Sequence, residues 1–476
     1  MDAKPYDLVV IGSGPAGEKG AAQAAYFGKS VALVEFEPIL GGACTNTGTL
    51  PSKTLRETAL FLSGFRTREL SGVHLTVKKA VTVRDFMSHE QHVTADDRVR
   101  ILKNLGRHKV DLFYGRGSFA DPHTVAVTPM GGGEPAYLRG EKVLIAVGSS
   151  PHRPPVFRFE DQRIYDSDEI LQLPEMPDSM LVVGGGVIGC EYACMFAILG
   201  IDVTVVEMRG SVIDFLDGEV VANLVDQMKA IGIKFLMNDS VDTLDDGPEL
   251  TVTLKSGTVL KPASILVSAG RSGNTKGLGL EAIGLDVDPR GRVKVNEQFQ
   301  TNIPHVYAAG DVIGAPALAS TSMEQARVAM VHAFELKYKN VVAPILPYGI
   351  YTIPECSMAG ETEEALRKQG VDYVVGKACY DSNARGHIIG DPNGFLKLLF
   401  RSDDMTLLGV HVIGEQATEL VHVGLTALLL GQKVDLFINT CYNYPTLTEL
   451  YKYAAYDALG KQALALRERA TSRVNG

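Results

Sequence analysis

The strongest constraint on the fold is an apolar run near the start of the chain that ends in a cluster of glycines. Gly12, Gly14 and Gly17 follow this run with G-x-G-x-x-G spacing, and a helical stretch comes next. A second apolar run then closes on Glu35. Short apolar runs separated by a helix indicate a βαβ unit with parallel strands.

Each glycine of this motif has its own structural reason. Gly12 permits a tight turn, Gly14 lets the backbone approach a pyrophosphate group, and Gly17 lets the helix pack closely on the strand. Glu35 stands at the end of the second strand, where a carboxylate can hold ribose hydroxyls. The unit therefore predicts a dinucleotide site.

The same arrangement recurs in the middle of the chain. Gly184, Gly186 and Gly189 follow another apolar run, and the strand after the next helix ends on Glu207. A carboxylate there accepts a hydrogen bond from the 2′-hydroxyl of NAD and repels a 2′-phosphate. Arg209 is either a cation for that phosphate or a solvated loop charge. The sequence thus predicts two dinucleotide sites in one chain.

Composition narrows the class of protein further. The chain has 476 residues and a net charge of −10, which favours several domains and argues against nucleic acid as a partner. It has no apolar run of membrane-spanning length, and its N-terminus enters a strand pattern at once, so the cytoplasm is the expected compartment. Six cysteines without metal-ligand spacing predict neither a disulfide scaffold nor a metal site.

A family resemblance lies at residues 41–53, which read GGACTNTGTLPSK. They resemble the GGxCxNxGCxPSK signature of the pyridine nucleotide–disulfide oxidoreductases, which include lipoamide, glutathione and mercuric reductases. Residues 146–151, 301–311 and 444–449 resemble further motifs of that family, in the same order. The resemblance implies tightly bound FAD, held by the first glycine motif, by Glu35 and by Gly42, Gly148, Gly310 and Asp311.

Two positions depart from the family pattern. The family's second cysteine, which contacts the flavin and pairs with the first, is Thr49 here, so Cys44 has no partner. The family's C-terminal histidine, which moves protons for thiol substrates, is Tyr444, in a motif that closes on Glu449. A phenol with an ordinary pKa of about 10 is a poor base at neutral pH. We therefore expect no reduction of thiol or disulfide substrates and expect Cys44 to be a spectator.

Within the family, residues 41–53 and the sequence NYPT near the C-terminus resemble the soluble, flavin-dependent pyridine nucleotide transhydrogenases. The stretch around Gly270 also looks similar to them. The resemblance implies hydride exchange between NAD(H) and NADP(H), with Gly270 among the residues that bind the nicotinamide nucleotide. Glu207 departs from this expectation, because it favours NAD.

Lys53 and Glu191 match the ion pair that the family places beside flavin N5. Each lies near the start of a helix inside a glycine motif. A cation near the flavin stabilises the anionic reduced ring, and a carboxylate orients that cation. We therefore predict that these two residues form the catalytic ion pair.

The expected fold is α/β, with two Rossmann-like domains and a C-terminal α+β dimerisation domain. We expect the FAD-binding domain at 1–150 and 272–344, the NAD(P)-binding domain at 151–271 and the dimerisation domain at 345–476. In the family, the C-terminal segment of one subunit reaches the flavin of the other, so a homodimer is expected. Further expected elements are strands at 264–268, 306–311, 395–400 and 407–413, and helices at 415–430 and 448–459.

The expected mechanism is a reversible ping-pong hydride transfer between NADPH and NAD, mediated by FAD. Two alternatives stay open. The first is an NAD(P)H:quinone or dye reductase that uses the same flavin with another acceptor. The second is a non-catalytic flavoprotein component of a dehydrogenase complex, against which the intact Lys53, Glu191 and both glycine motifs weigh.

Overall fold

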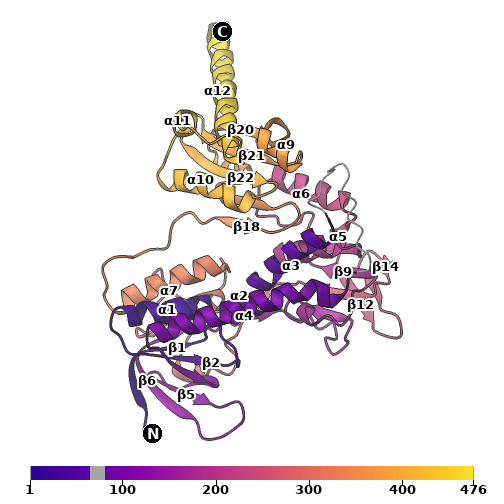
Figure 1. Cartoon of the computed structure of the whole chain (residues 1–476). Coiled ribbons are helices and arrows are strands. Elements are labelled where there is room, and N and C mark those ends of the chain that lie inside the picture. Colours follow the sequence, from indigo (N-terminus) through magenta and orange to yellow (C-terminus); the bar gives the residue numbers. More distant parts are fainter. Residues whose placement is uncertain (1, 65–80, 475–476) are drawn as a thin grey trace.

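The computed structural model describes residues 2–64 and 81–474. Figure 1 shows an N-terminal α/β unit, a second α/β unit beside it, and a C-terminal unit from which helix α12 (Leu450–Val474) projects. No described helix is both long and apolar enough to cross a bilayer.

The N-terminal unit is built on a seven-stranded sheet with the order β3-β2-β1-β6-β5-β4, and β17 pairs with β6. Strand β1 is parallel to β2 and β6 and is buried at its carboxyl end, as expected for a parallel strand covered on both faces. Figure 1 shows helices α1, α4 and α7 together over this sheet. The strands are β1 (Lys4–Ile11), β2 (Val31–Glu35), β3 (Asp111–Tyr114), β4 (Arg116–Asp121), β5 (Thr124–Thr128), β6 (Ala136–Ile145) and β17 (Val306–Ala308), and the helices are α1 (Pro15–Tyr26), α2 (Gly42–Asn46), α3 (Thr49–Leu62), α4 (Val83–Arg107) and α7 (Ala319–Ala333).

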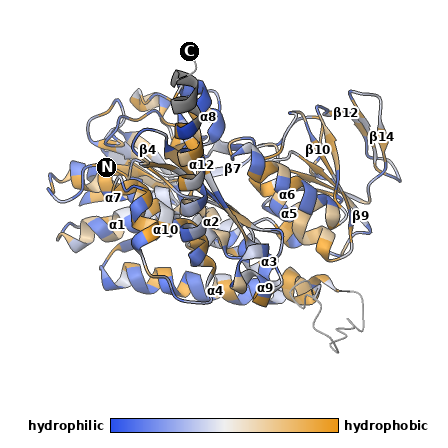
Figure 2. Ribbon diagram, turned by 90° about the horizontal axis from the view of Figure 1, so that it is seen from above, coloured by the Kyte–Doolittle hydropathy of each residue, from blue (hydrophilic) through white to orange (hydrophobic). Residues whose placement is uncertain are grey.

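The second unit repeats this plan with a parallel sheet in the order β11-β10-β9-β15-β8. Figure 2 shows hydrophobic residues along β9 and β10, in keeping with their burial. A small antiparallel sheet, β12-β13-β14, extends from it. The elements are β8 (Ile164–Asp166), η2 (Glu169–Gln172), β9 (Ser179–Val183), α5 (Val187–Ile198), β10 (Asp202–Glu207), α6 (Gly218–Ala230), β11 (Lys234–Met237), β12 (Val241–Asp245), β13 (Thr251–Leu254), β14 (Val259–Leu260) and β15 (Ser264–Val267).

The chain passes between these two units twice, and the two passages pair with each other. Strand β7 (Ser149–Pro151) runs antiparallel to β16 (Arg271–Gly273). The predicted limits at 150/151 and 271/272 lie in this two-stranded ribbon. We propose that the domains divide at these two positions.

The C-terminal unit is an antiparallel sheet, β18-β19-β22-β21-β20, flanked by helices. Two elements differ from the expected ranges. Helix α12 runs past the predicted end at 459 to Val474, and the strand expected at 306–311 ends at Ala308, because Gly310 adopts a φ of +83° and turns the chain into η4 (Asp311–Ile313). The remaining elements are η3 (Glu281–Ile283), β18 (Tyr348–Ile350), β19 (Cys356–Gly360), α8 (Glu363–Gln369), β20 (Tyr373–Cys379), η5 (Tyr380–Ser382), α9 (Ala384–Ile389), β21 (Phe395–Arg401), β22 (Leu407–Ile413), α10 (Ala417–Leu429), α11 (Val434–Asn439) and η6 (Leu447–Glu449).

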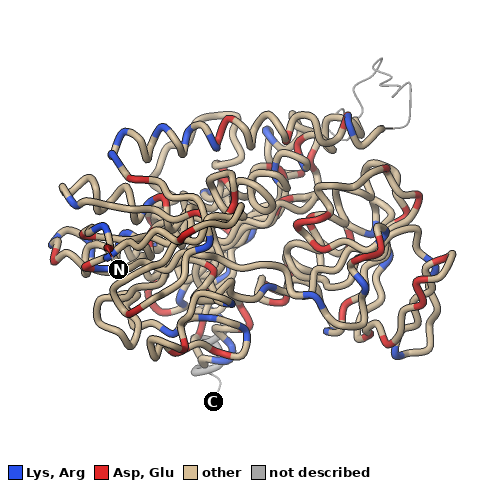
Figure 3. The backbone as a smooth tube through the Cα atoms, turned by 90° about the horizontal axis from the view of Figure 1, so that it is seen from below, with Lys and Arg blue, Asp and Glu red and all other residues tan. Residues whose placement is uncertain are grey.

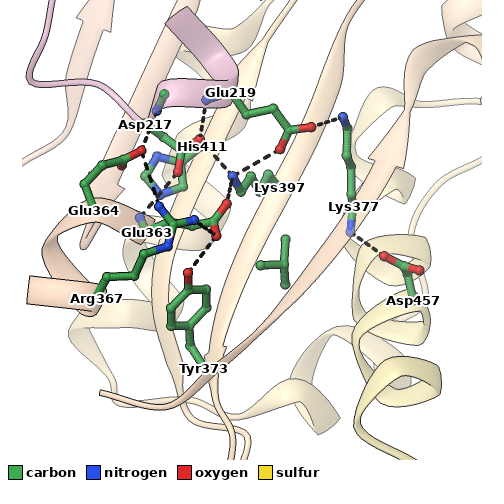
Figure 4. A network of polar contacts seen from close by, with 12 residues as sticks. Asp217, Glu219, Glu363, Glu364, Arg367, Tyr373, Lys377, Lys397, His411 and Asp457 are labelled. Carbon is green, nitrogen blue, oxygen red and sulfur yellow. Dashed lines mark hydrogen bonds and ion pairs between the residues drawn. The ribbon is translucent and has the colours of Figure 1, made fainter. Parts of the chain in front are cut away.

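A buried lysine joins the second unit to the C-terminal unit. Figure 4 shows the carboxylates of Asp217, Glu219 and Glu363 directed at the ammonium group of Lys397. The Lys397 side chain has no exposed surface, and its Nζ lies 2.8 Å from Asp217 Oδ1. Burial opposes the charge, but the hydrogen bonds to these carboxylates outweigh it and raise the pKa of Lys397. Asp217 also caps α6 by accepting from the Glu219 N–H, so the network fixes where that helix begins.

We expect Lys397→Met to lower the free energy of unfolding by about 3 kcal/mol, because it leaves buried carboxylates without their cation. The matched control is Lys377→Met, since Lys377 pairs with Glu219 but is partly exposed and should cost under about 1 kcal/mol. Urea denaturation followed by circular dichroism measures both variants. Equal midpoints for the two would contradict a structural role for the buried charge.

Candidate active site

The first glycine motif forms the turn between β1 and α1. Gly12 has a φ of +102°, and a Cβ there would lie 2.4 Å from the carbonyl oxygen of Ala146. A Cβ on Gly17 would lie 1.8 Å from the Gly12 oxygen, so the helix meets the strand at backbone contact. The nearest atom to a Cβ on Gly14 is 3.9 Å away. Gly12 and Gly17 are therefore required by packing, whereas Gly14 leaves backbone open to a ligand.

Glu35 is held beside this turn at the end of β2. Its Oε2 accepts from the Ser13 N–H at 2.8 Å, and its Oε1 accepts from the Glu37 N–H at 2.9 Å. A carboxylate has about four acceptor positions. Backbone donors thus orient the buried group while acceptor capacity remains for hydroxyls of a ligand.

A cavity of about 2090 Å³ extends from this turn toward the second and C-terminal units. It is large enough for an extended dinucleotide, since pockets for drug-sized ligands are about 300–1,000 Å³. Many of the predicted site residues line it: Gly12, Gly14, Glu35, Gly42, Cys44, Lys53, Gly148, Glu191, Gly310 and Asp311.

Glycines shape the wall of this cavity near the first turn. Gly42 has a φ of +56°, and a Cβ there would lie 2.9 Å from the Cα of Gly14. The two backbones therefore meet side by side. Gly148 has a φ of +66°, and no atom lies within 4 Å of the position its Cβ would take. Gly42 and Gly148 both line the cavity, where Gly148 leaves the main chain open to a ligand, and these features fit a flavin dinucleotide.

Asp311 ends a hydrogen-bonded chain that sequence reasoning did not find. Ser149 Oγ donates to Asp311 Oδ2 at 2.9 Å, and Arg271 Nε donates to Ser149 Oγ at 2.8 Å. Arg271 also donates to the Ser149 carbonyl at 2.7 Å. Ser149 and Arg271 face each other only because β7 pairs with β16, and no local sequence pattern signals a pairing across 122 residues.

Lys53 and Glu191 meet where the first two units join. Lys53 Nζ lies 2.7 Å from Glu191 Oε2, and Glu191 Oε1 accepts from the Tyr351 N–H at 2.9 Å. The Glu191 side chain is only 4% exposed, while Lys53 is 28% exposed and faces the cavity. Lys53 Nζ also lies 4.9 Å from the centre of the Tyr351 ring. The arrangement aims a fixed cation into the cavity.

Cys44 lies against Thr49 on the same wall. Burial raises the pKa of the Cys44 thiol, and a hydrogen bond with the Thr49 hydroxyl offsets that effect only in part. The thiol therefore stays protonated at neutral pH and is a poor nucleophile. All six cysteines are free.

The second glycine motif has the geometry of the first. Gly184 has a φ of +105°, and a Cβ there would lie 2.6 Å from the Ser268 oxygen. A Cβ on Gly189 would lie 2.0 Å from the Gly184 oxygen, whereas no atom lies within 4 Å of one on Gly186. Gly270, with a φ of +96°, also faces open space. Helix α5, which starts at this turn, reaches the cavity through Val187, Ile188 and Glu191.

Glu207 and Arg209 form an ion pair beside this second turn. Glu207 Oε2 accepts from the Gly185 N–H at 2.6 Å, and Glu207 Oε1 accepts from Arg209 Nε at 3.0 Å. Burial raises the pKa of Glu207, but these donors outweigh it and lower the pKa. Arg209 Nη1 also donates to Asp214 Oδ1 at 2.6 Å. Arg209 is therefore paired with two carboxylates while its side chain is 46% exposed, and its role toward a phosphate stays a prediction.

The described chain does not bring every predicted residue to the cavity. Tyr444 and Glu449 are not among the lining residues, and Tyr444 is 73% exposed. Their contact with a flavin stays a prediction that requires a second subunit. Other predicted residues that do not line the cavity are Gly17, Gly184, Gly186, Gly189, Glu207, Arg209 and Gly270. The cavity also holds side chains that were not predicted as site residues: Phe215, Tyr348, Tyr351, Thr418 and His422.

The first glycine turn and Glu35 line the cavity, and the start of α5 after the second turn reaches it through Val187 and Ile188, close to the Lys53–Glu191 pair. This arrangement defines an oxidoreductase built for a flavin and a nicotinamide dinucleotide. Comparison with known proteins agrees: the pattern of the pyridine nucleotide-disulphide oxidoreductases matches residues 6–332, and that of their dimerisation domain matches residues 346–455. The chain belongs to this family, whose members use FAD and NAD(P)(H).

Two curated relatives with high similarity carry the same name. A soluble pyridine nucleotide transhydrogenase from Mycobacterium tuberculosis (strain ATCC 25177 / H37Ra) is 47% identical over 459 residues, covering 96% of this chain and 98% of the relative. One from Pseudomonas putida (strain W619) is 41% identical over 468 residues, with the same coverage.

Solved structures show the same fold. LpdA from Mycobacterium tuberculosis superposes with a TM-score of 0.88 at 25% identity, covering 95% of this chain and 99% of that chain. The HOCl-induced flavoprotein disulfide reductase RclA from Escherichia coli gives a TM-score of 0.84 at 25% identity, covering 94% and 98%.

The contrast between Gly186 and Gly189 gives a matched test of the second turn. Gly186→Ala adds a methyl group in open space, so stability should be retained while the Kd for NAD⁺ rises about ten-fold, or ~1.4 kcal/mol. Gly189→Ala forces helix and strand apart and should lower the free energy of unfolding by about 2 kcal/mol. Calorimetric titration and thermal unfolding measure the two effects. Equal stability of both variants would refute the close approach at Gly189.

Proposed function

We propose that this chain is an FAD-dependent pyridine nucleotide transhydrogenase that moves hydride reversibly between NADPH and NAD⁺. The observation that carries the proposal is Thr49, which stands against Cys44 where a disulfide relay needs a second sulfur. The Lys53–Glu191 pair and both glycine turns are intact beside it. The names of the relatives from Mycobacterium and Pseudomonas support the same activity.

The residues that would hold FAD surround the first turn. The open backbone at Gly14, with Gly42 packed against it on the cavity wall, suits the pyrophosphate. Glu35 suits the ribose hydroxyls, and Asp311 suits the ribityl hydroxyls. Bound FAD supplies a ring that accepts a hydride from one nicotinamide and returns it to another.

The ion pair sets the charge at the reacting end of the cavity. Glu191 cannot leave Lys53, because its carboxylate is buried and held by the Tyr351 N–H. Lys53 therefore keeps its ammonium group in one place, where it stabilises negative charge that develops nearby. The Cys44 thiol, held protonated, adds no competing anion.

We further propose a cytoplasmic homodimer whose substrates are small dinucleotides. The matched dimerisation domain supports the dimer, and it would bring Tyr444 and Glu449 of one subunit toward the cavity of the other. Figure 3 shows both Lys or Arg and Asp or Glu along much of the described chain, and the net charge of −10 argues against nucleic acid as a partner.

The direct test follows reduction of thio-NAD⁺ by NADPH, with purified FAD-loaded protein and no added quinone. Rapid reduction of the analogue, with transfer in the reverse direction as well, supports the transhydrogenase. Turnover only with quinones or dyes would replace it by the reductase. No turnover with any acceptor, together with co-purification of acyltransferase subunits, would replace it by the structural component.

The Cys44 thiol gives a second test of mechanism. Because direct hydride transfer needs no sulfur, Cys44→Ser should keep NADPH to thio-NAD⁺ transfer within about three-fold, under about 1 kcal/mol in barrier. Cys379→Ser is the matched control, since Cys379 is also half-buried and lies on β20, away from the cavity. Full flavin content with abolished transfer in Cys44→Ser alone would show that the sulfur takes part.

A further inference from the structure

One pocket must bind two nucleotides that differ only by a 2′-phosphate, if the proposed function holds. The buried carboxylate of Glu207 suits the 2′-hydroxyl of NAD(H). It would repel the phosphate of NADP(H), which carries at least one full negative charge. The region of Glu207 therefore has to contain a cation that can face the phosphate.

Arg209 is that cation, and it is shared between two carboxylates. Its guanidinium lies 3.0 Å from Glu207 and 2.6 Å from Asp214. The two partners differ in burial: the Glu207 side chain is 4% exposed and Asp214 is 48% exposed. A phosphate that arrives from solvent therefore competes with Asp214 more directly than with Glu207.

The segment that carries Asp214 is anchored on both sides. On one side, the Ile213 N–H donates to the Gly185 oxygen at 3.0 Å, and Ile213 is buried with a φ of +42°. On the other side, Asp217 is fixed by Lys397 (Figure 4). The backbone on either side of Asp214 is therefore pinned, so its carboxylate remains close to Arg209.

We infer that Arg209 is a two-position cation that lets one pocket accept both NAD(H) and NADP(H), and that Asp214 is a specificity-determining residue that competes with the 2′-phosphate for it. With NAD(H), the 2′-hydroxyl of the ribose donates a hydrogen bond to Glu207, and Arg209 stays paired with Asp214. With NADP(H), the phosphate replaces Asp214 as the partner of Arg209, and the guanidinium neutralises Glu207.

The test compares Asp214→Asn with Asp202→Asn. Asp202 also forms an exposed ion pair, with Lys234 at 2.7 Å, but it begins β10 whereas Glu207 ends it. Both variants remove one negative charge from the same unit. Calorimetric titration of FAD-loaded protein with NAD⁺ and with NADP⁺ gives the ratio Kd(NADP⁺)/Kd(NAD⁺). Asp214→Asn should lower this ratio at least three-fold, and Asp202→Asn should leave it unchanged.

Arg209→Gln is expected to have the opposite effect. Because it removes the cation that would face the 2′-phosphate, it should raise the ratio Kd(NADP⁺)/Kd(NAD⁺) at least ten-fold. The inference is overturned if Asp214→Asn changes the ratio no more than Asp202→Asn does, or if Arg209→Gln leaves it unchanged. Because the readout is binding, it is independent of turnover. Absent transhydrogenation with the expected ratios would reject the proposed function alone, and unchanged ratios with normal transhydrogenation would reject this inference alone.

Discussion

The ion pair between Lys53 and Glu191 is the interaction on which the arrangement of the site depends. Glu191 is almost fully buried, so its carboxylate needs both a cation and a backbone donor to offset the loss of hydration. The cation comes from α3 of the N-terminal unit, and the donor, Tyr351, comes from the segment that follows β18. One carboxylate on α5 therefore ties together all three units between the two glycine turns.

The packing beneath this pair explains how charge can be held so firmly there. Residues of α3, of α5 and of the segment after β18 share one buried apolar cluster, which includes Leu55, Ala193 and Ile353. One turn along α3 from Lys53, Arg56 is also buried and donates to the Thr352 carbonyl at 3.0 Å. The helix thus directs neighbouring cations to two different units, and the apolar cluster fixes its position for both.

Local sequence predicted what local geometry determines. The glycine turns could be predicted from spacing, because each required glycine avoids a clash with backbone of the same βαβ unit or of the segment that follows a neighbouring strand. These glycines are Gly12, Gly17, Gly184 and Gly189. The Lys53–Glu191 pair could be anticipated only through a family resemblance, since it spans 138 residues.

Other features of the structure could not be predicted from the sequence, because they depend on contacts between segments that are far apart in the chain. The chain from Arg271 through Ser149 to Asp311 depends on how β7 pairs with β16, and the buried Lys397 depends on α6 meeting β21. The range predicted for α12 was too short, because the helix projects from the body of the unit (Figure 1) and loses the apolar periodicity that marks a packed helix.

Thr49, which stands where the family has its second cysteine, also has a consequence for nucleotide specificity at the second glycine turn. Without a disulfide to carry electrons away, the hydride donor and the hydride acceptor of the proposed reaction would both bind at the glycine turn of residues 184–189. A pocket shaped for one nucleotide alone would then block half of the reaction. In the inferred arrangement, the buried Glu207 and the half-exposed Arg209, 3.0 Å apart, accommodate both nucleotides. Glu207 faces the 2′-hydroxyl of NAD(H), and Arg209 faces the 2′-phosphate of NADP(H). Exchange of partners at an exposed guanidinium costs little, whereas Glu207 stays oriented by the Gly185 N–H throughout.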